Sequence, residues 1–278
     1  MSERYGVFGN PVNHSKSPAI HAAFAAACNQ DLAYEAILAP RDGFADCVRV
    51  FVAAGGCGAN VTVPFKQEAC RLATRLTPRA RLAGAVNTLS FDSTGWLGDN
   101  TDGAGLLRDL TNNLGCTISG TRVLLLGAGG AARGVLGPLL EAAPSRLVIA
   151  NRTPASAHEL AERMTGAGKL GACSYPQLAG ESFDLVINAT SASLAGEPLA
   201  LPDGIFAPGS LAYDMMYGQG QTPFLLLAAS HGATRLADGL GMLVEQAAEA
   251  FHLWRGVRPA TAPVMAMLRA DRNECGSR

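Results

Sequence analysis

The chain has 278 residues, of which 48% are hydrophobic and 16% charged, and its formal net charge is −1. This length exceeds a typical single domain of roughly 100 to 200 residues, and the apolar fraction supplies enough side chains for a buried core. A nearly neutral chain has no broad electrostatic attraction for nucleic acid or for an anionic membrane. We therefore expect two compact domains that bind small molecules, with neither nucleic acid nor membrane as a partner.

The first residues and the cysteines indicate the compartment. The segment Met1–Gly9 has neither the apolar stretch of a signal peptide nor the Arg-rich character of a transit peptide. No run of residues reaches the roughly 18 apolar positions that a membrane span requires. The seven cysteines are scattered and include no Cys-x-x-Cys pair, which argues against a disulfide framework and against a zinc site. We expect a cytoplasmic protein with no metal.

In chain order, short strand-like runs alternate with helical stretches over roughly the first hundred residues. The expected elements there are the strands Arg4–Gly9, Leu32–Leu38, Ala59–Val63 and Ala85–Leu89 and the helices Pro18–Ala27 and Gly43–Ala53. Trp96–Gly98 is expected to be one more short strand, and Asp102–Leu114 a helix that ends at Gly115. The alternation predicts an α/β sheet with crossover helices.

A second α/β alternation follows. Its expected strands are Arg122–Leu126, Leu147–Ala150, Leu185–Asn188 and Leu211–Asp214. Continuous apolar runs of this kind are what parallel strands buried on both faces require. The chain from Gly239 to Arg269 is helical again, and we expect it to pack on the first unit. The expected fold class is thus α/β, with one domain formed by residues 1–102 with 240–278, a second formed by residues 103–239, and a cleft between them.

A glycine-rich turn stands at positions 127–132, where Gly-Ala-Gly-Gly-Ala-Ala follows the strand Arg122–Leu126 and opens a helix. Gly127 permits a tight turn, Gly129 lets a pyrophosphate approach the backbone, and Ala132 allows close packing of helix on strand. A tight turn without a ligand is the alternative. The strand before the turn and the helix after it favour a dinucleotide site, and hence a Rossmann-like domain.

The next strand of this domain ends at Asn151–Arg152, where an NAD-binding domain carries an acidic residue for the adenine ribose. That acidic residue is absent. Arg152 is suited to charge-assisted hydrogen bonds with a 2′-phosphate, which a carboxylate would repel. The sequence therefore favours NADP(H) over NAD, and an exposed surface arginine is the alternative reading of Arg152.

Two polar clusters of the first unit precede helices, at strand ends where open α/β sheets bind ligands. Ser15 and Ser17 lie before the first helix and are suited to hold a carboxylate, although simple N-capping by Ser17 fits as well. Asp99 and Asp102 precede the helix at 102–114, and each is also a plausible helix cap. The residue types alone leave these alternatives open.

A third cluster, Asn60–Lys66, reads as an edge-like strand ended by Pro64, with Asn60 and Thr62 on one face. The chain has only three lysines and many arginines. A lysine, unlike an arginine, can gain and lose a proton at neutral pH, so Lys66 is a candidate for proton transfer. A solvated lysine at a helix start is the alternative.

Together these segments resemble the shikimate dehydrogenase family, over nearly the whole chain from about Tyr5 to Leu268. The matching segments are Ser15–Pro18, Asn60–Lys66, Gly84–Thr88, Asn100–Gly103, Gly127–Ala131, Asn151–Thr153, Asn188–Ser191, Tyr213–Met215 with Tyr217, and Asp238–Leu243 with Gln246. Such an ordered set is far more specific than any single motif.

The resemblance implies the reversible NADPH-dependent reduction of 3-dehydroshikimate to shikimate, in chorismate and aromatic amino acid biosynthesis, by a monomer or homodimer. The implied catalytic pair is Lys66 and Asp102. The implied substrate ligands are Ser15, Ser17 and Tyr217 for the carboxylate, and Thr62, Lys66, Asn87, Asp102 and Gln246 for the hydroxyls. The implied cofactor ligands are Gly127, Ala128, Gly129, Gly130 and Ala131 for the pyrophosphate, Asn151, Arg152 and Thr153 for the adenosine end, and Met215 and Gly239 for the nicotinamide end. Residues 1–102 with 240–278 would bind substrate, and residues 103–239 would bind NADP.

One position departs from the family pattern. Many NADP-using members carry a second basic residue three positions after the Asn-Arg-Thr triplet, and Ser156 stands there. The loss of one charge-assisted contact would weaken the NADP preference by about 1 kcal/mol or more. Three alternatives follow: a quinate/shikimate dehydrogenase with relaxed NAD/NADP use, a non-catalytic NADP-binding sensor, and an amino-acid or folate-linked dehydrogenase that shares only the nucleotide half. Lys66 and Asp102 disfavour the sensor.

Overall fold

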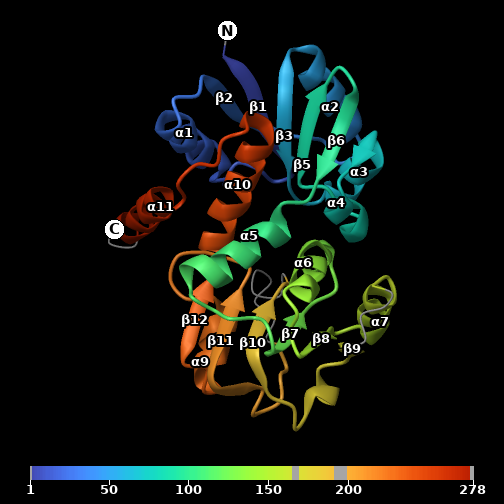
Figure 1. Cartoon of the computed structure of the whole chain (residues 1–278), viewed down its shortest axis with the longest axis vertical. Helices are drawn as coiled ribbons and strands as arrows, with labels where there is room; N and C mark the ends of the chain where they lie inside the picture. The colour runs from blue at the N-terminus through green and yellow to red at the C-terminus, as the bar shows by residue number, and fades with distance from the viewer. Residues whose placement is uncertain (1, 165–168, 191–198, 276–278) are drawn as a thin grey trace. The chain divides into compact units, whose positions relative to one another are not determined.

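The computed structural model describes residues 2–164, 169–190 and 199–275 (Figure 1). The chain forms two compact units, the first made of Met1–Gly105 with Leu243–Cys275 and the second of Leu106–Met242. Each unit is built on one six-stranded sheet. None of the helices in the described ranges combines the length and apolar content that a bilayer crossing requires.

The first unit contains a mixed sheet with strand order β2-β1-β3-β5-β6-β4. Its strands are β1 (Glu3–Gly9), β2 (Leu32–Leu38), β3 (Gly56–Val61), β4 (Arg75–Leu76), β5 (Thr88–Asp92) and β6 (Gly95–Asp99). Parallel pairing joins β1 to β2 and β3, and antiparallel pairing joins β5 to β3 and β6. The helices are α1 (Ser17–Ala27), α2 (Phe44–Ala53), α3 (Lys66–Leu72), α4 (Pro78–Ala83), α5 (Asp102–Arg108), α10 (Leu240–Arg255) and α11 (Ala262–Cys275), with α5 and α10 running across the boundary between the units.

The core of the first unit includes an aromatic cluster beneath α2 and α3. Phe44 and Phe65 stack with ring centroids 4.7 Å apart, and Phe8 meets Phe44 edge-on at 5.9 Å. All three rings are almost completely buried. Such packing is worth about 0.5–1.5 kcal/mol per aromatic pair beyond area burial. Phe65 is the residue before Lys66, so this core fixes the start of α3, from which Lys66 projects.

Two expectations for the first unit are wrong. The segment at Asn60 is no edge strand, because β3 lies between β1 and β5; Pro64 falls after the last paired residue and so removes no hydrogen bond of the ladder. The strand expected at Ala85–Leu89 is β5 (Thr88–Asp92), because a hairpin with β6 decides its extent. The apolar residues Ala85 and Val86 are buried without being in the strand.

The second unit contains a fully parallel sheet with strand order β12-β11-β10-β7-β8-β9. Its strands are β7 (Arg122–Leu126), β8 (Arg146–Ala150), β9 (Leu170–Cys173), β10 (Phe183–Asn188), β11 (Phe206–Asp214) and β12 (Arg235–Asp238). The order reverses at β7, which lies between β8 and β10. In open parallel sheets ligands bind at such a switch point, beyond the carboxyl ends of the strands.

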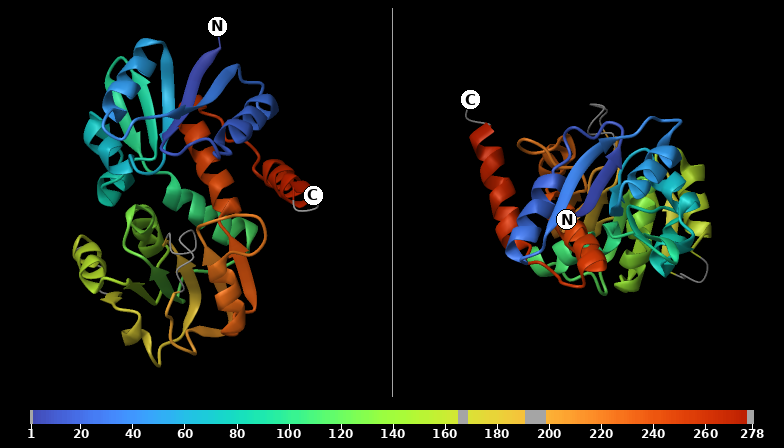
Figure 2. Two further views of the ribbon diagram at one scale, coloured as in Figure 1. Left: turned by 180° about the vertical axis from the view of Figure 1, so that it is seen from behind. Right: turned by 90° about the horizontal axis from the view of Figure 1, so that it is seen from above.

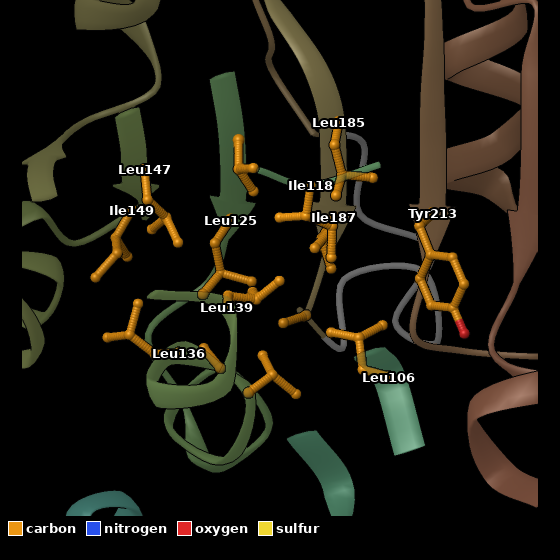
Figure 3. Close-up of a cluster of buried hydrophobic side chains, with 14 of the residues drawn as sticks. Leu106, Ile118, Leu125, Leu136, Leu139, Leu147, Ile149, Leu185, Ile187 and Tyr213 are labelled. Carbon is orange, nitrogen blue, oxygen red and sulfur yellow. The ribbon is translucent and has the colours of Figure 1, made fainter. Parts of the chain in front are cut away.

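The inner strands β7, β8 and β10 are buried on both faces along most of their length, as their continuous apolar runs predict. Leu125, Leu147 and Ile149 point into one core with α6 (Gly130–Glu141) and α7 (Pro154–Glu162), shown in Figure 3. Leu124 and Leu126 point into the opposite core, which α9 (Pro223–Ser230) and η2 (Pro176–Leu178) complete. Figure 2 shows the ribbon from two further sides. Side chains packed on both faces of the sheet therefore hold β7, and with it the start of the turn that follows.

The helix expected at Asp102–Leu114 changes its winding part-way. Helix α5 continues as the π-helical turn η1 (Asp109–Asn113). The Asp109 carboxylate is buried and accepts hydrogen bonds from Tyr213 Oη at 2.7 Å and Asn113 Nδ2 at 3.0 Å. A Cβ atom added to Gly241 would lie 2.0 Å from Asp109 Oδ1, so that glycine is required for the close approach. These tertiary contacts decide the winding, which local spacing does not reveal.

Candidate active site

Half-buried Lys66 and buried Asp102 form an ion pair in the first unit. Lys66 is the first residue of α3 and Asp102 the first residue of α5. Lys66 Nζ donates to Asp102 Oδ2 at 2.6 Å, with side chains 20% and 8% exposed. A pair this short and this sheltered interacts more strongly than a surface pair, because little water screens it. The solvated helix-start reading of Lys66 is therefore wrong, although the residue does begin a helix.

The second oxygen of Asp102 is held by an amide. Asn87 Nδ2 donates to Asp102 Oδ1 at 2.7 Å, and Gln246 Oε1 lies 3.3 Å from the same nitrogen. Asn87 Oδ1 accepts from the backbone N–H of Thr101 at 2.8 Å, which can only donate, so the amide orientation is fixed. The structure thus brings together Lys66, Asn87, Asp102 and Gln246. Gln246 comes from α10, far along the chain from the other three.

The loop before α5 is braced by Asp99, whose side chain is 1% exposed. Its carboxylate accepts from Thr77 Oγ1 at 2.6 Å, Arg79 Nε at 2.7 Å and the Asn100 N–H at 2.7 Å. Burial alone would raise the pKa of Asp99, but the hydrogen bonds and charge of Arg79, with those of Thr77 and Asn100, hold it below its usual range. Asp99 therefore supports the loop that carries Asp102.

Asn100 is a site-forming residue that the sequence analysis did not single out for a role. Its Oδ1 accepts from the Asp102 N–H at 3.2 Å, and its Nδ2 donates to the Ala85 carbonyl at 3.0 Å. It caps the first turn of α5 and ties it to the segment before Asn87. The local signal was an Asn two residues before a helix start, a common position for an Asx turn.

Ser15 and Ser17 lie at the start of α1, where Ser15 Oγ accepts from the Ser17 N–H at 3.3 Å. Ser17 is 7% exposed and is already the first residue of the helix. The N-cap position before it is occupied by Lys16, whose side chain makes no capping hydrogen bond. The expectation of simple N-capping by Ser17 is therefore wrong. Thr62 lies just beyond β3, half-buried, and its N–H donates to the Phe8 carbonyl at 2.9 Å.

The glycine-rich turn of the second unit follows the switch-point strand β7 and begins α6. Gly127 has φ +106°, and an added Cβ atom would lie 3.2 Å from the Ala189 backbone, so a side chain there would be strained and tightly packed. At Gly129 and Gly130 an added Cβ atom would meet nothing within 4 Å. Open space over two glycines before a helix N-terminus is what a pyrophosphate requires. The backbone therefore fits a dinucleotide.

The triplet Asn151–Thr153 follows β8, the neighbour of β7. Asn151 Nδ2 donates to the Thr153 carbonyl at 3.0 Å, which fixes the turn. The side chains of Arg152 and Thr153 are exposed. Ser156, which is half-buried, brings no positive charge to this turn. An exposed guanidinium beside the strand next to the glycine-rich turn fits the expected position of an adenosine 2′-phosphate.

Met215 and Gly239 are neighbours at the ends of β11 and β12. A Cβ atom added to Gly239 would lie 2.3 Å from the Met215 carbonyl oxygen, and Gly239 N–H donates to the Met216 carbonyl at 3.0 Å. Two buried residues brace this junction: Asn188 Nδ2 donates to Asp214 Oδ1 at 3.0 Å. No local sequence pattern indicates a role for either residue, because their contact joins positions 26 residues apart.

The expected site residues divide between the units. Ser15, Ser17, Thr62, Lys66, Asn87, Asp102 and Gln246 belong to the first unit, and Tyr217 belongs to the second with every expected cofactor residue. Burial raises the pKa of Tyr217 above its usual value, so its hydroxyl is a neutral donor. Among the described residues no group of three or more His, Cys, Asp or Glu side chains is placed to hold a metal ion.

A parallel sheet with a glycine-rich turn at its switch point, and a separate unit with a buried Lys–Asp pair, define a nucleotide-dependent α/β oxidoreductase. Three family models match: the shikimate dehydrogenase substrate binding domain over residues 7–89, shikimate / quinate 5-dehydrogenase over residues 109–195, and the shikimate 5′-dehydrogenase C-terminal domain over residues 239–269. The chain belongs to the NADP(+)-dependent shikimate dehydrogenase family.

Its relatives resemble it over their full length. A shikimate dehydrogenase (NADP(+)) from Dechloromonas aromatica is 66% identical over 97% of this chain and 98% of its own. Among solved structures, an Ael1 enzyme from Pseudomonas putida is 52% identical with a TM-score of 0.92, covering 96% of this chain and 98% of its own. Shikimate 5-dehydrogenase from Thermus thermophilus, in complex with NADP(H) and shikimate, is 33% identical with a TM-score of 0.85, covering 96% and 99%. The resemblance seen in the sequence and the expected fold class are confirmed.

Proposed function

We propose that this chain catalyses the reversible reduction of 3-dehydroshikimate to shikimate with NADPH, a step toward chorismate and the aromatic amino acids. The observation that carries the proposal is the 2.6 Å ion pair of Lys66 and Asp102, set among the amides of Asn87 and Gln246. Relatives at 55–66% identity over at least 96% of this chain carry the name shikimate dehydrogenase (NADP(+)).

Lys66 supplies and removes the proton. When bound, the nicotinamide supplies or accepts a hydride at the substrate carbon that carries the oxygen. In the reducing direction the Lys66 ammonium donates a proton to the oxygen of that carbon, and in the oxidising direction the amine takes it back. Asp102, 2.6 Å away, favours the ammonium form and fixes its position. The Asn87 amide keeps Asp102 from rotating.

Polar groups around this pair hold the substrate in our proposal. Ser15 and Ser17, with Tyr217 of the second unit, take the carboxylate by hydrogen bonds. Thr62, Asn87 and Gln246 take the ring hydroxyls, together with the catalytic pair. Two contacts in the first unit support this assignment. The serine hydroxyl and amide of Ser15 and Ser17 lie together, and the amides of Asn87 and Gln246 lie beside the Lys66–Asp102 pair. Hydrogen bonds from neutral donors can hold a carboxylate when a helix N-terminus lies beside them.

The second unit binds the cofactor in our proposal. Gly127, Ala128, Gly129, Gly130 and Ala131 hold the pyrophosphate, supported by the open space at Gly129 and Gly130, where α6 begins. Asn151, Arg152 and Thr153 hold the adenosine end, and Met215 and Gly239 the nicotinamide end. Residues 1–102 with 240–278 thus act as the substrate domain and residues 103–239 as the NADP domain. The six described cysteines form no disulfide, which supports a reducing compartment such as the cytoplasm.

A second candidate is a broader quinate/shikimate dehydrogenase that also accepts NAD. The favouring observation is Ser156, which places no positive charge where many NADP-using relatives have one. The family model over residues 109–195 includes quinate dehydrogenases in its name. Arg152 alone then decides the preference for the 2′-phosphate.

The test is the initial rate of nicotinamide reduction by the purified chain, with shikimate or quinate crossed against NADP or NAD. The proposal expects rapid turnover only with shikimate and NADP. Comparable rates with quinate or NAD would move the assignment to the second candidate. Absence of turnover in every combination would overturn both.

A further inference from the structure

We propose that Asp214 is a positioning residue for the substrate, because its carboxylate closes the loop that carries Tyr217. This inference rests on the proposed function, in which Tyr217 binds the substrate carboxylate, and deepens it. Asp214 is the last residue of β11 and is completely buried. It lies outside the set of expected substrate and cofactor ligands.

Both ends of the loop 215–222 are bound to this one carboxylate. Asp214 Oδ1 accepts from the Met216 N–H at 3.0 Å, directly after the strand. Asp214 Oδ2 accepts from Thr222 Oγ1 at 2.5 Å, at the residue that caps the next helix, α9. Thr222 is 8% exposed, whereas residues 218–221 between the two anchors are exposed. The carboxylate therefore holds the two ends of an otherwise exposed loop together.

The neighbouring strand β10 orients the carboxylate. Asn188 pairs with Asp214 in the parallel register, and its Nδ2 donates to Asp214 Oδ1 at 3.0 Å. Asn188 Oδ1 accepts from the Thr190 N–H at 3.1 Å. A backbone N–H can only donate, so the amide of Asn188 cannot be turned the other way. The orientation of Asp214 is thus set by the sheet and not by the loop that it anchors.

Tyr217 depends on these anchors for its position. It follows Met216 directly, and its half-buried hydroxyl is a neutral donor, because burial raises its pKa above the usual value. Within the described part of the chain no group forms a hydrogen bond with this hydroxyl. The backbone on either side, fixed at Met216 and Thr222, therefore places it. Release of one anchor should displace the hydroxyl without removing it.

The catalytic step is separate from this loop. Lys66 contacts Asp102 within the first unit, whereas Tyr217 belongs to the second. The substrate carboxylate does not change in the proposed reaction, so a displaced Tyr217 weakens the binding of substrate and transition state alike. The Met215 N–H keeps its bond to the Asn188 carbonyl at 2.9 Å, so the proposed nicotinamide end is retained. The expected defect is therefore in substrate binding.

Asp214→Asn and Thr222→Val release the same end of the loop. In Asp214→Asn the amide oxygen must face the N–H groups of Met216 and Asn188, because an NH2 group cannot accept from them. The NH2 group then faces Thr222, whose buried hydroxyl loses its acceptor. Thr222→Val removes the hydroxyl itself, and Thr222→Ser is the conservative variant that keeps it.

The matched control is Leu211→Val, which trims a buried side chain of β11 and leaves both anchors in place. The readouts are steady-state kinetics with shikimate at saturating NADP and calorimetric titration of shikimate into the NADPH-saturated protein. Shikimate and NADPH are both reduced, so this complex cannot react and its Kd reports binding alone. Tyr217→Phe, alone and combined with Asp214→Asn, tests whether the aspartate acts through the tyrosine.

We expect Asp214→Asn and Thr222→Val each to raise the KM and the Kd for shikimate about fivefold, with kcat within about threefold and the Kd for NADP within about twofold. Thr222→Ser and Leu211→Val should bind shikimate like the unchanged protein. Tyr217→Phe should raise the Kd about tenfold, and Asp214→Asn added to it should raise the Kd by less than about a further twofold.

Unchanged shikimate binding in Asp214→Asn or in Tyr217→Phe would overturn the inference. An equal loss from Asp214→Asn with and without the tyrosine hydroxyl would overturn it too, because the aspartate would then be merely structural. If the unchanged protein binds shikimate without turning it over, the proposed function fails, while the calorimetric comparison still decides the role of Asp214.

Discussion

At the scale of single residues, a lysine is chemically suited to the position beside Asp102 and an arginine is not. A guanidinium stays protonated throughout the accessible pH range, whereas an ammonium can give up a proton and regain it. Lys66 Nζ contacts one carboxylate oxygen at 2.6 Å, and the other oxygen is occupied by Asn87. Asp102 therefore has one fixed partner on each oxygen, and the Lys66 ammonium is held in a defined position.

Ser15 is expected to contribute ground-state binding. In Ser15→Ala the KM for shikimate should rise about tenfold while kcat falls by less than about threefold, because in the proposed site the serine holds a carboxylate that does not change during the reaction. Steady-state kinetics at saturating NADP measure both constants. A fall in kcat at an unchanged KM would contradict the carboxylate assignment.

Arg152 is expected to decide the cofactor preference. Arg152→Ala should raise the KM for NADP about 10- to 100-fold and change the KM for NAD little, because one charge-assisted contact with the 2′-phosphate is lost. Ser156→Lys is the complementary variant, and it should lower the KM for NADP by roughly fivefold. Equal effects of Arg152→Ala on the two cofactors would show that the guanidinium does not bind the phosphate.

At the scale of helices and strands, Asp102, the proposed catalytic aspartate, depends on a loop fixed by ion pairs. Asp99 binds Arg79, and Arg79 also contacts Glu249 of α10 at 3.1 Å. Burial would raise the pKa of Glu249, but Arg258 and Arg79 hold it below its usual range. The start of α5 is thereby tied to α4 and to Glu249 of α10, and these contacts lie within the first unit.

Asp99→Asn should lower the free energy of unfolding by roughly 3 kcal/mol, since it leaves Arg79 without its closest partner in a largely buried pair. The matched control is Asp92→Asn, which breaks the exposed pair with Arg75 in the same unit and should have little effect. Urea denaturation at pH 7 followed by circular dichroism measures both. Equal losses in the two variants would refute the role assigned to Asp99.

The sequence predicts an element well where burial alone decides it. The expected strand Arg122–Leu126 coincides with β7, because apolar residues must cover both of its faces. The shift of β5 and the π-helical turn at Asp109 could not be predicted, since a hairpin and a contact with Tyr213 decide them. Lys66 and Asp102 were found through local motifs, whereas Asn100 and Asp214 act through side-chain contacts between distant segments.

At the scale of the whole molecule, the chain leaves the first unit after Gly105 and returns to it at Leu243. The proposed reaction needs groups from both units, because the pyrophosphate turn and Tyr217 belong to one and the Lys–Asp pair to the other. The proposed activity should therefore be measured on a chain that contains both units.

Stability of the whole chain should fall with acid because of His21. Burial lowers the pKa of His21 to about 3. The unfolded chain takes up a proton at this position below about pH 6.5 and the folded chain does not. The free energy of unfolding should thus decrease by up to about 1.4 kcal/mol per pH unit between pH 6 and 4 through this residue.

His21→Phe preserves the aromatic packing and removes the titrating group. Urea denaturation at pH 7, 6 and 5 should show a shallower pH dependence for this variant than for the unchanged protein. The difference in slope isolates His21 from the other titrating residues. Parallel slopes would mean that His21 is protonated in the folded chain too.

The most direct test of the central claim is the turnover number of Lys66→Ala for shikimate oxidation by NADP, with NADP binding measured on the same sample. The account predicts a kcat at least about 100-fold below that of the unchanged protein, the usual scale for a general acid or base, and an NADP Kd within about twofold. A kcat close to that of the unchanged protein would remove Lys66 from the chemistry and contradict the account.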